Sequence, residues 1–236
     1  MATKYSPKIV TNGLVLSLDA ANNKSYSGSG TTWSDLSGNS YNGTLTNGPT
    51  FNSGNGGSIV FDGTNDYVDT VNTGTTFQFS NTTFTLSLWV KTNSVSAGIL
   101  ISKGATASTG GWLVNYNANG TFSATTKFSD GFNAADRSSV SSINDNNWYN
   151  VVIIITTNTS TQSSNNLLLY LNGILNQSSL TLSNVYAATA DTIQIGRRPS
   201  GGYFSGNISN VQIYNRLLST TEILQNYNAT KARFGY

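Results

Sequence analysis

The stretch FTLSLWVK (residues 84–91) decides the fold, because apolar and polar residues alternate along it. Successive side chains of a β-strand point to opposite faces, so this alternation predicts a strand with one face in a core. The core-facing residues are Phe84, Leu86, Leu88 and Val90. Trp89 falls on the polar face, where only a covering segment could bury it.

Other short segments repeat this pattern with turn-forming residues between them, as expected for an antiparallel all-β chain. They are LVLSL (14–18), SIVFD (58–62), GWLVNY (111–116), VVIII (151–155), LLLYL (167–171), TIQIG (192–196) and NVQIY (210–214). In residues 148–156 both alternating sets are apolar. This predicts a central strand that is covered on both faces, with Trp148 in the core.

Two Asn-Gly pairs, Asn119-Gly120 and Asn172-Gly173, separate adjacent segments of this kind and predict hairpins with type I′ turns. Towards the C-terminal end, Ser219 and Glu222 have the spacing of a capping box, which predicts one short helix. The apolar stripe that would dock this helix on the sheets consists of Ile223, Leu224 and Tyr227.

The composition excludes several kinds of chemistry. Only 9% of the residues are charged, against about 25% in an average domain, and the net charge of +2 includes no basic stripe. Nucleic acid and anionic membranes are therefore not expected as partners. Because the chain has neither cysteine nor histidine, it has no disulfide, no thiolate or histidine metal site and no Ser-His-Asp catalysis.

The length of 236 residues fits one domain, expected at 13–236 after an N-terminal arm at 1–12. The start of the chain has no apolar run of the length that a signal peptide requires. We therefore expect synthesis in a host cytoplasm without a signal peptide.

An ordered set of motifs resembles the laminin-G-like, concanavalin A-like lectin/glucanase superfamily over nearly the whole chain. The motifs are WSDLSGNSYNGTL (33–45), FDGTNDYV (61–68), FTLSLWVK (84–91), NNWYNVVIII (146–155), LYLNGIL (169–175) and the closing stretch 193–234. The resemblance implies a jelly-roll β-sandwich of two antiparallel sheets, to which the predicted C-terminal helix is added. Versions that resemble this one are typical of bacteriophage structural proteins, which implies a place on the virion surface.

Calcium is the one metal for which the sequence offers ligands, because hard cations take carboxylate and amide oxygens. The expected ligands lie in two loops and are Asp35, Asn39, Asn42, Asp62 and Asp66. Similar lectin-like modules bind calcium with a further acid in the closing strand, where this chain has Ser209. Hydrogen bonding in Asx-turns is the alternative role for these loop residues.

A sugar site needs ring faces for stacking, with neutral amides and hydroxyls that orient the sugar. The expected ligand-binding rings are Trp33, Tyr41, Trp112, Tyr116 and Tyr203. Trp112 and Tyr116 share one face of their strand, and Tyr203 lies in a turn. Core packing is the alternative for each ring.

The fold is shared by lectins, hydrolases and assembly proteins, so the site residues decide the function. Glucanases of the superfamily use two carboxylates, usually glutamates, whereas this chain has one glutamate, Glu222, in the predicted capping box. We therefore expect a non-enzymatic, virion-associated lectin-like module that binds a cell-surface glycan. The alternative is a capsid-decoration or tail-fibre protein that contacts other virion proteins or forms a homo-oligomer, and a glycoside hydrolase is a distant third.

Overall fold

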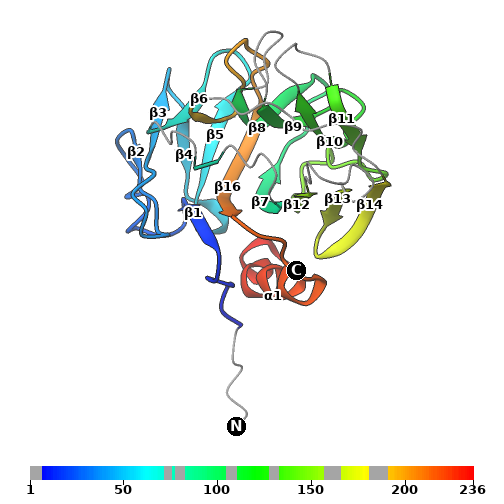
Figure 1. Ribbon diagram of the computed structural model, residues 1–236. Helices are drawn as coiled ribbons and strands as arrows, with labels where there is room; N and C mark the ends of the chain where they lie inside the picture. Colours follow the sequence, from blue (N-terminus) through cyan, green and yellow to red (C-terminus); the bar gives the residue numbers. More distant parts are fainter. Residues whose placement is uncertain are drawn as a thin grey trace.

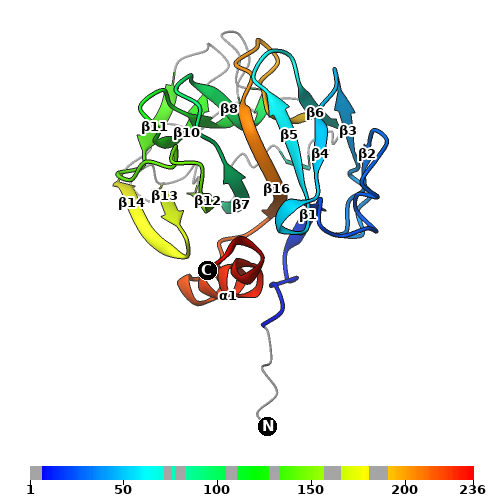
Figure 2. The ribbon, with the colours of Figure 1, turned by 180° about the vertical axis from the view of Figure 1, so that it is seen from behind.

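The computed structural model describes residues 7–71, 76–77, 83–104, 111–127, 133–156, 166–180 and 191–236. In this part of the chain two antiparallel sheets pack face to face, and a single α-helix lies at one end of the sandwich (Figures 1 and 2). The predicted all-β jelly-roll sandwich with a C-terminal helix is confirmed. Among the described residues, no helix has both the length and the apolar character needed to cross a membrane.

The first sheet has eight strands, and the closing strand of the chain runs through it (Figure 2). Its order is β14 (Ile174–Leu180), β13 (Asn166–Leu171), β12 (Trp148–Thr156), β7 (Thr83–Lys91), β16 (Ser205–Tyr214), β5 (Ser58–Asp62) and β4 (Thr50–Asn52). β1 (Leu14–Asp19) also pairs with β16. The two ends of the folded domain are therefore hydrogen-bonded to each other.

The second sheet also has eight strands. Its order is β11 (Asn133–Ser138), β10 (Phe122–Lys127), β9 (Gly111–Tyr116), β8 (Gly98–Gly104), β15 (Ile193–Ile195), β6 (Tyr67–Thr70), β3 (Gly43–Thr46) and β2 (Thr32–Trp33). β8 pairs with β9, its neighbour in sequence, and with β15, which follows almost 90 residues later. This long-range pairing brings the segment after β15 beside the start of β8.

The core between the sheets confirms the buried face that the alternation of residues in β7 predicts. Phe84, Leu86 and Leu88 are fully buried in the main hydrophobic cluster. They stand opposite Ile155, Ile153 and Val151 of β12, respectively, which are also fully buried. Since full burial of one such side chain contributes about 1.5–3 kcal/mol, this ladder is a large part of the stabilisation of the first sheet.

The outer face of β12 is covered, as its apolar character predicts. Val152 and Ile154 belong to a second cluster of buried side chains outside the main core. The remaining buried members of that cluster are Tyr170, Tyr214, Leu218 and Ile223. The last of these comes from the helix, so the docked helix explains why both faces of β12 are apolar.

The helix α1 (Thr220–Thr230) starts with the predicted capping box, in which the Ser219 side chain accepts from the Glu222 backbone N–H and the Glu222 side chain accepts from the Ser219 N–H. Ile223 is buried, whereas Leu224 is 46% exposed, so the expected apolar stripe is narrower than predicted. The 3-10 helix η3 (Lys231–Phe234) follows α1. Its Phe234 ring stacks on Trp89 with ring centroids 4.0 Å apart, which supplies the cover that the polar-face tryptophan requires.

Trp148 lies in the same small cluster as Trp89 and Phe234, so it is buried as predicted, but beneath the C-terminal segment rather than between the sheets. The residues just before β1 pack on the helix too. The Val10 N–H donates to Asn226 Oδ1 at 2.8 Å, and the Val10 carbonyl accepts from the Tyr214 hydroxyl at 3.0 Å. Residues 7–12 of the expected arm therefore lie against the domain, and residues 1–6 lie outside the described residues.

The two Asn-Gly hairpins differ. Asn172 and Gly173 both have positive φ, 51° and 80°, as a type I′ turn requires, and this prediction is confirmed. In the other pair only Gly120 has positive φ (84°), and its N–H donates to the Asn117 carbonyl at 2.8 Å. The type I′ prediction is wrong at this turn, because the Gly120 carbonyl accepts from the Ile143 N–H and the turn packs against that neighbouring segment.

Candidate ligand-binding site

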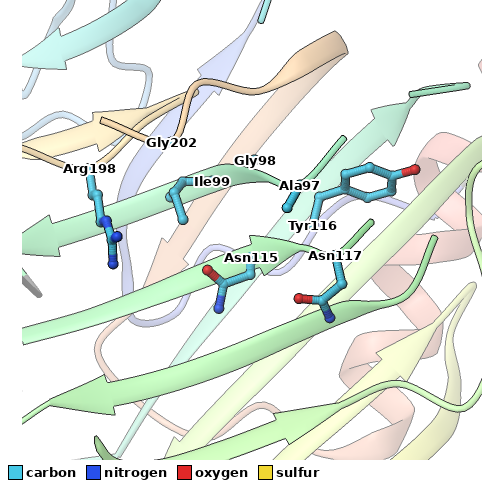
Figure 3. A pocket seen from close by; sticks show the side chains of 8 residues that line it. All are labelled: Ala97, Gly98, Ile99, Asn115, Tyr116, Asn117, Arg198 and Gly202. Atoms are coloured by element: carbon cyan, nitrogen blue, oxygen red, sulfur yellow. The ribbon is translucent and has the colours of Figure 1, made fainter. Parts of the chain in front are cut away.

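An open pocket of about 200 Å³ lies where the start of β8, the end of β9 and the segment between β15 and β16 meet (Figure 3). Its lining residues are Ala97, Gly98, Ile99, Asn115, Tyr116, Asn117, Arg198 and Gly202. The segment between β15 and β16 lies at the end of the sandwich opposite α1 in both ribbon views (Figures 1 and 2). The pocket is therefore remote from the docked termini.

Backbone pairing fixes the walls of this pocket. Gly98 stands opposite Tyr116 in the β8–β9 ladder, and Ile99 stands opposite Asn115. The Ile99 N–H donates to the Gly202 carbonyl at 2.8 Å, outside the β8–β9 pairing. A β-carbon at Gly98 would lie 2.7 Å from the Phe204 Cα, so the close approach of these two segments requires glycine there.

A tight turn positions Arg198. The Arg198 N–H donates to the Gly201 carbonyl at 3.1 Å, and the Gly201 N–H donates back to the Arg198 carbonyl at 2.9 Å. Pro199 follows Arg198, and proline sets the φ that the second position of such a turn needs. Gly202 continues the chain at φ 78°, a conformation that favours glycine.

Two asparagine side chains from β9 and the residue after it supply neutral hydrogen-bonding groups. Asn115 Nδ2 donates to Ser123 Oγ and to Thr125 Oγ1, each at 3.2 Å, so the neighbouring strand β10 holds this amide in place. Asn117 Nδ2 donates to Thr121 Oγ1 at 3.0 Å. Figure 3 shows both amides and the Arg198 guanidinium projecting to the same side of the strands, whereas the Tyr116 ring points away from them.

The ring of Tyr116 contributes to the core rather than to the open part of the pocket. It is fully buried, lies edge-on to Phe204 at 6.1 Å between ring centroids, and its hydroxyl donates to the Ser94 carbonyl. Burial raises the pKa of this phenol. Tyr116 is one of the rings expected to contact a sugar, and it lines the pocket without presenting a free face to it.

The other four expected rings lie outside the pocket lining. Trp33 and Trp112 are fully buried in the main cluster, and Trp112 Nε1 donates to the Phe77 carbonyl at 3.2 Å. Tyr41 is half-buried, with its ring centroid 5.1 Å from that of Phe77. Tyr203 is half-buried and directly follows the lining residue Gly202. The structure thus brings the Tyr203 turn and Tyr116 to one place but leaves Trp33, Tyr41 and Trp112 elsewhere.

The first expected calcium loop is organised by hydrogen bonds to Asp35. Its Oδ1 accepts from the backbone N–H groups of Ser17 and Ser37, both at 2.9 Å. Its Oδ2 accepts from the Ser37 hydroxyl at 2.7 Å and from the Tyr41 N–H at 3.1 Å. These bonds attach the loop to β1 in the way that the Asx-turn alternative describes.

The amides of that loop also have protein partners. Asn42 Oδ1 accepts from the Asp35 N–H at 2.9 Å. Asn39 Nδ2 donates to the Val15 carbonyl at 3.1 Å. The three expected ligands of this loop therefore lie close together, held by hydrogen bonds to one another and to β1.

The second expected calcium loop connects β5 and β6. Hydrogen bonds from the Thr64 and Asn65 N–H groups to Asp62 lower the pKa of Asp62, whereas burial raises the pKa of Asp66. Asp66 Oδ2 accepts from the Asp62 N–H at 3.2 Å. No cluster of three or more His, Cys, Asp or Glu side chains occurs in the part of the chain that the structure describes. Calcium binding by these loops stays a prediction.

Glu222 has a structural environment. The Arg216 guanidinium donates to both of its carboxylate oxygens, at 2.6 and 3.0 Å, and the Ser219 N–H donates to Oε2 at 2.9 Å. The hydrogen bond from Arg216 is the main reason that the pKa of Glu222 falls to about 2. The carboxylate is thus fixed at the helix start, at the end of the sandwich opposite the pocket (Figure 1).

The residues that sequence reasoning missed are Ile99, Asn115, Asn117 and Arg198. The available signal was the alternation of β9, in which Trp112, Val114 and Tyr116 are apolar and Asn115 lies on the opposite face. The apolar set is buried, so an accessible ligand surface had to be sought on the asparagine face. Arg198 follows a different strand, and no local pattern connects it to Asn115.

Solved structures of similar fold include binding domains of a mosquitocidal protein and of botulinum neurotoxins. They include the binding domain of Paraclostridial mosquitocidal protein 1 (TM-score 0.71, 18% identity, covering 93% of this chain and 52% of that chain). The botulinum neurotoxin type G receptor-binding domain has a TM-score of 0.65 at 18% identity, covering 92% and 51%. The binding domain of botulinum neurotoxin DC, in complex with SialylT, has a TM-score of 0.71 at 15% identity, covering 93% and 52%.

The chain spans about half the length of these toxin domains, and at such identities the likeness establishes the fold alone. No curated protein matches the sequence. A family described as the concanavalin A-like lectin/glucanases superfamily (Laminin_G_3) matches residues 62–224, which is more than half of the chain. The chain therefore belongs to this laminin-G-like family of concanavalin A-like domains.

Proposed function

We propose that this chain is a non-enzymatic glycan-binding module whose ligand site is the pocket between β8, β9 and the 198–202 turn. The observation that carries the proposal is that two amides and one guanidinium line the same pocket as the apolar side chain of Ile99 and project to the same side of the strands. Binding sites for small ligands combine an apolar surface with a few convergent polar groups in this way. Oδ1 of Asn115 accepts no hydrogen bond from the described residues and is available to a sugar hydroxyl.

The lining of the pocket supports binding rather than hydrolysis. Glycosidases need two carboxyl groups on either side of the scissile bond, roughly 5–10 Å apart. None of the residues that line this pocket is acidic. The single glutamate, Glu222, is held by Arg216 at the far end of the sandwich.

The toxin domains of similar fold give this proposal its context. They are binding or receptor-binding domains, and one of them is in complex with SialylT. Binding is therefore a role of domains with this fold. Because this chain shares only the fold with those domains, the residues of its own pocket carry the proposal.

We further propose display on a phage particle, where the module would bind a cell-surface glycan. The support for this setting is the resemblance of the closing stretch 193–234 to bacteriophage structural proteins. The proposal predicts that the protein occurs in purified particles, which immunoblotting of gradient-purified virions tests. Its absence from particles that are otherwise complete would contradict the virion setting and leave the glycan proposal untouched.

A structural role in assembly is the second candidate, and an exposed apolar surface favours it. Ile174 is 71% exposed, Leu175 49% and Leu224 46%. The hairpin and the helix adjoin, because a β-carbon at Gly173 would lie 3.3 Å from Leu224 Cδ1. Light scattering of the purified protein tests this role, since a defined oligomer that becomes monomeric in an Ile174→Ser, Leu175→Ser variant would support subunit contacts through this surface.

The glycan proposal is tested on an array of bacterial polysaccharides, with calcium and with chelator, using wild-type protein and an Asn115→Ala variant. Loss of a neutral hydrogen bond costs about 0.5–1.5 kcal/mol, so the variant should bind roughly 2- to 10-fold more weakly. Asn119→Ala is the matched control, because Asn119 is exposed in the turn that follows β9 but does not line the pocket. Equal losses in both variants, or no binding by wild-type protein to any glycan, would contradict the proposal.

A further inference from the structure

Arg198 is the one charged residue among those that line the pocket. Within the described part of the chain its guanidinium takes part in no hydrogen bond, ion pair or ring contact. Its Nε is out of contact with solvent and has no acceptor among the described residues, which is also true of Arg197 Nε and Arg233 Nε. Arginine stays protonated in proteins, and a buried donor without an acceptor costs free energy, so this arrangement is unfavourable in the unliganded protein.

The guanidinium groups of the other four arginines each have a partner among the described residues. Arg216 and Arg233 form ion pairs with Glu222 and Asp19, at 2.6 and 3.1 Å. The Arg197 guanidinium lies over the Tyr67 ring, 3.4 Å from its centroid, and Arg137 donates to a backbone carbonyl. Of the five arginines of the chain, Arg198 is the one whose guanidinium has no partner among the described residues, and it is the one that lines the pocket.

The charge in the pocket is not balanced by any other residue that lines it. None of the lining residues is acidic, so the guanidinium contributes an uncompensated positive charge to the open side of the pocket. The planar fork of arginine matches a carboxylate, with which it forms two parallel N–H···O bonds. The amide oxygen of Asn115 and the side chain of Asn117 lie on the same side of the strands and can accept from neighbouring hydroxyls (Figure 3).

We infer that the pocket binds a sugar residue that carries a carboxylate, such as a uronic acid, with Arg198 as its counter-ion. This inference rests on the proposed glycan-binding function and names the ligand class of the same site. A volume of about 200 Å³ is below the roughly 300–1,000 Å³ of pockets that enclose drug-sized ligands, which suits one sugar residue of a longer chain. Arg198 supplies the charge, and the two asparagines orient the ring.

The test uses pairs of polysaccharides that differ only in charge. Acidic bacterial polysaccharides and their carboxyl-reduced, neutral counterparts are titrated into the full chain by isothermal calorimetry at low and at high salt. A charged hydrogen-bonded group is worth roughly a 10- to 100-fold change in affinity, so reduction should weaken binding by that factor. Added salt should weaken binding of the acidic form more than that of the neutral form, because it screens the charge in an open pocket.

Two variants assign this preference to Arg198. Arg198→Gln should bind the acidic and the reduced forms equally, whereas Arg198→Lys keeps the charge but loses the planar fork and should retain part of the preference. Arg137→Gln removes one positive charge elsewhere and should leave the preference unchanged. Since the Arg198 side chain has no described partner, Arg198→Gln should melt at the wild-type temperature or above it.

The outcomes separate this inference from the function on which it rests. Wild-type protein that binds acidic and reduced forms equally would overturn the inference and leave glycan binding intact. An acid preference that persists in Arg198→Gln would place the charge recognition elsewhere and also overturn it. No binding to any polysaccharide of either kind would overturn both.

Discussion

Replacing Trp112 with phenylalanine separates a packing role from ligand contact for one of the expected sugar-binding rings. The indole is fully buried in β9, its centroid lies 5.5 Å from that of Phe84, and its Nε1 donates to the Phe77 carbonyl at 3.2 Å. Phenylalanine keeps one aromatic ring but cannot donate this bond and leaves part of the space empty.

The structure gives the expected size of the effect. Removing one partner of a buried hydrogen bond costs about 1–3 kcal/mol. The lost part of the indole adds on the order of 1 kcal/mol, a fraction of the 3–5 kcal/mol that truncation to alanine would cost. We expect the free energy of unfolding to fall by about 2–4 kcal/mol, and Tm by roughly 5–15 °C for a chain of this size.

Urea unfolding followed by circular dichroism measures the stability of Trp112→Phe, and calorimetry measures the affinity of the folded protein for a glycan identified on the array. With the ring buried on the core side, we expect an affinity within about two-fold of wild type. Trp148→Phe is a control for loss of an indole donor, because Trp148 Nε1 donates to Asn55 Oδ1 at 3.0 Å outside the main core. A Trp112→Phe protein of wild-type stability that no longer bound glycan would refute the packing argument.

Three further predictions concern the helix, its cover and the calcium loops. The hydrogen bond from Arg216 lowers the pKa of Glu222 from 4.5 to about 2. The ionised Glu222 side chain therefore contributes its full stabilisation of the fold above about pH 4.5, and this contribution is lost as the pH falls towards 2. Glu222→Gln should lower the unfolding free energy at pH 7 by about 1 kcal/mol, with a smaller difference at pH 3, and an equal difference in urea unfolding at both pH values would count against this reasoning. Phe234→Ala should lower the free energy of unfolding by about 2–4 kcal/mol. It should also shift tryptophan fluorescence emission to longer wavelength, since the Phe234 ring covers Trp89 with ring centroids 4.0 Å apart. Unchanged emission would show that Phe234 is not needed to shield Trp89 from water. If the Asp35 loop binds calcium, excess calcium should raise Tm relative to chelator and Asp35→Asn should abolish the rise, whereas equal Tm values for wild-type protein would contradict the calcium prediction.

The sandwich was predictable because its strands obey a local rule. In β7 the alternation of Phe84, Leu86 and Leu88 with polar residues is enough to assign the buried face, since a period of two fixes which side chains share a face. β12 breaks the alternation, and its apolar outer face correctly indicated a second covering element. The capping box at Ser219 likewise depends on residues three apart, so the helix start could be read directly.

Features that depend on the spatial neighbours of a residue could not be predicted in this way. Asn119-Gly120 has the composition of a type I′ turn, but the contact of Gly120 with Ile143 selects another turn. Trp112 and Tyr116 were assigned correctly to one face of β9, yet only the packing of the second sheet on the first shows that this face is the core. The sequence pattern identifies the two faces of a strand and leaves open which of them meets solvent.

The pocket combines several departures from local regularity, and this combination is itself an argument for function. β8 has an irregular register between Ile99 and Ile101, Gly98 leaves no room for a β-carbon, Gly202 has positive φ, and Arg198 Nε is buried with no acceptor among the described residues. Each departure costs stability or restricts the residues allowed, and proteins commonly accept such costs where a ligand is bound. β-Bulges in particular change the direction of side chains beside binding sites. A carboxylate at Arg198 would offset one of these departures, because it would give the guanidinium an acceptor that the described residues do not provide.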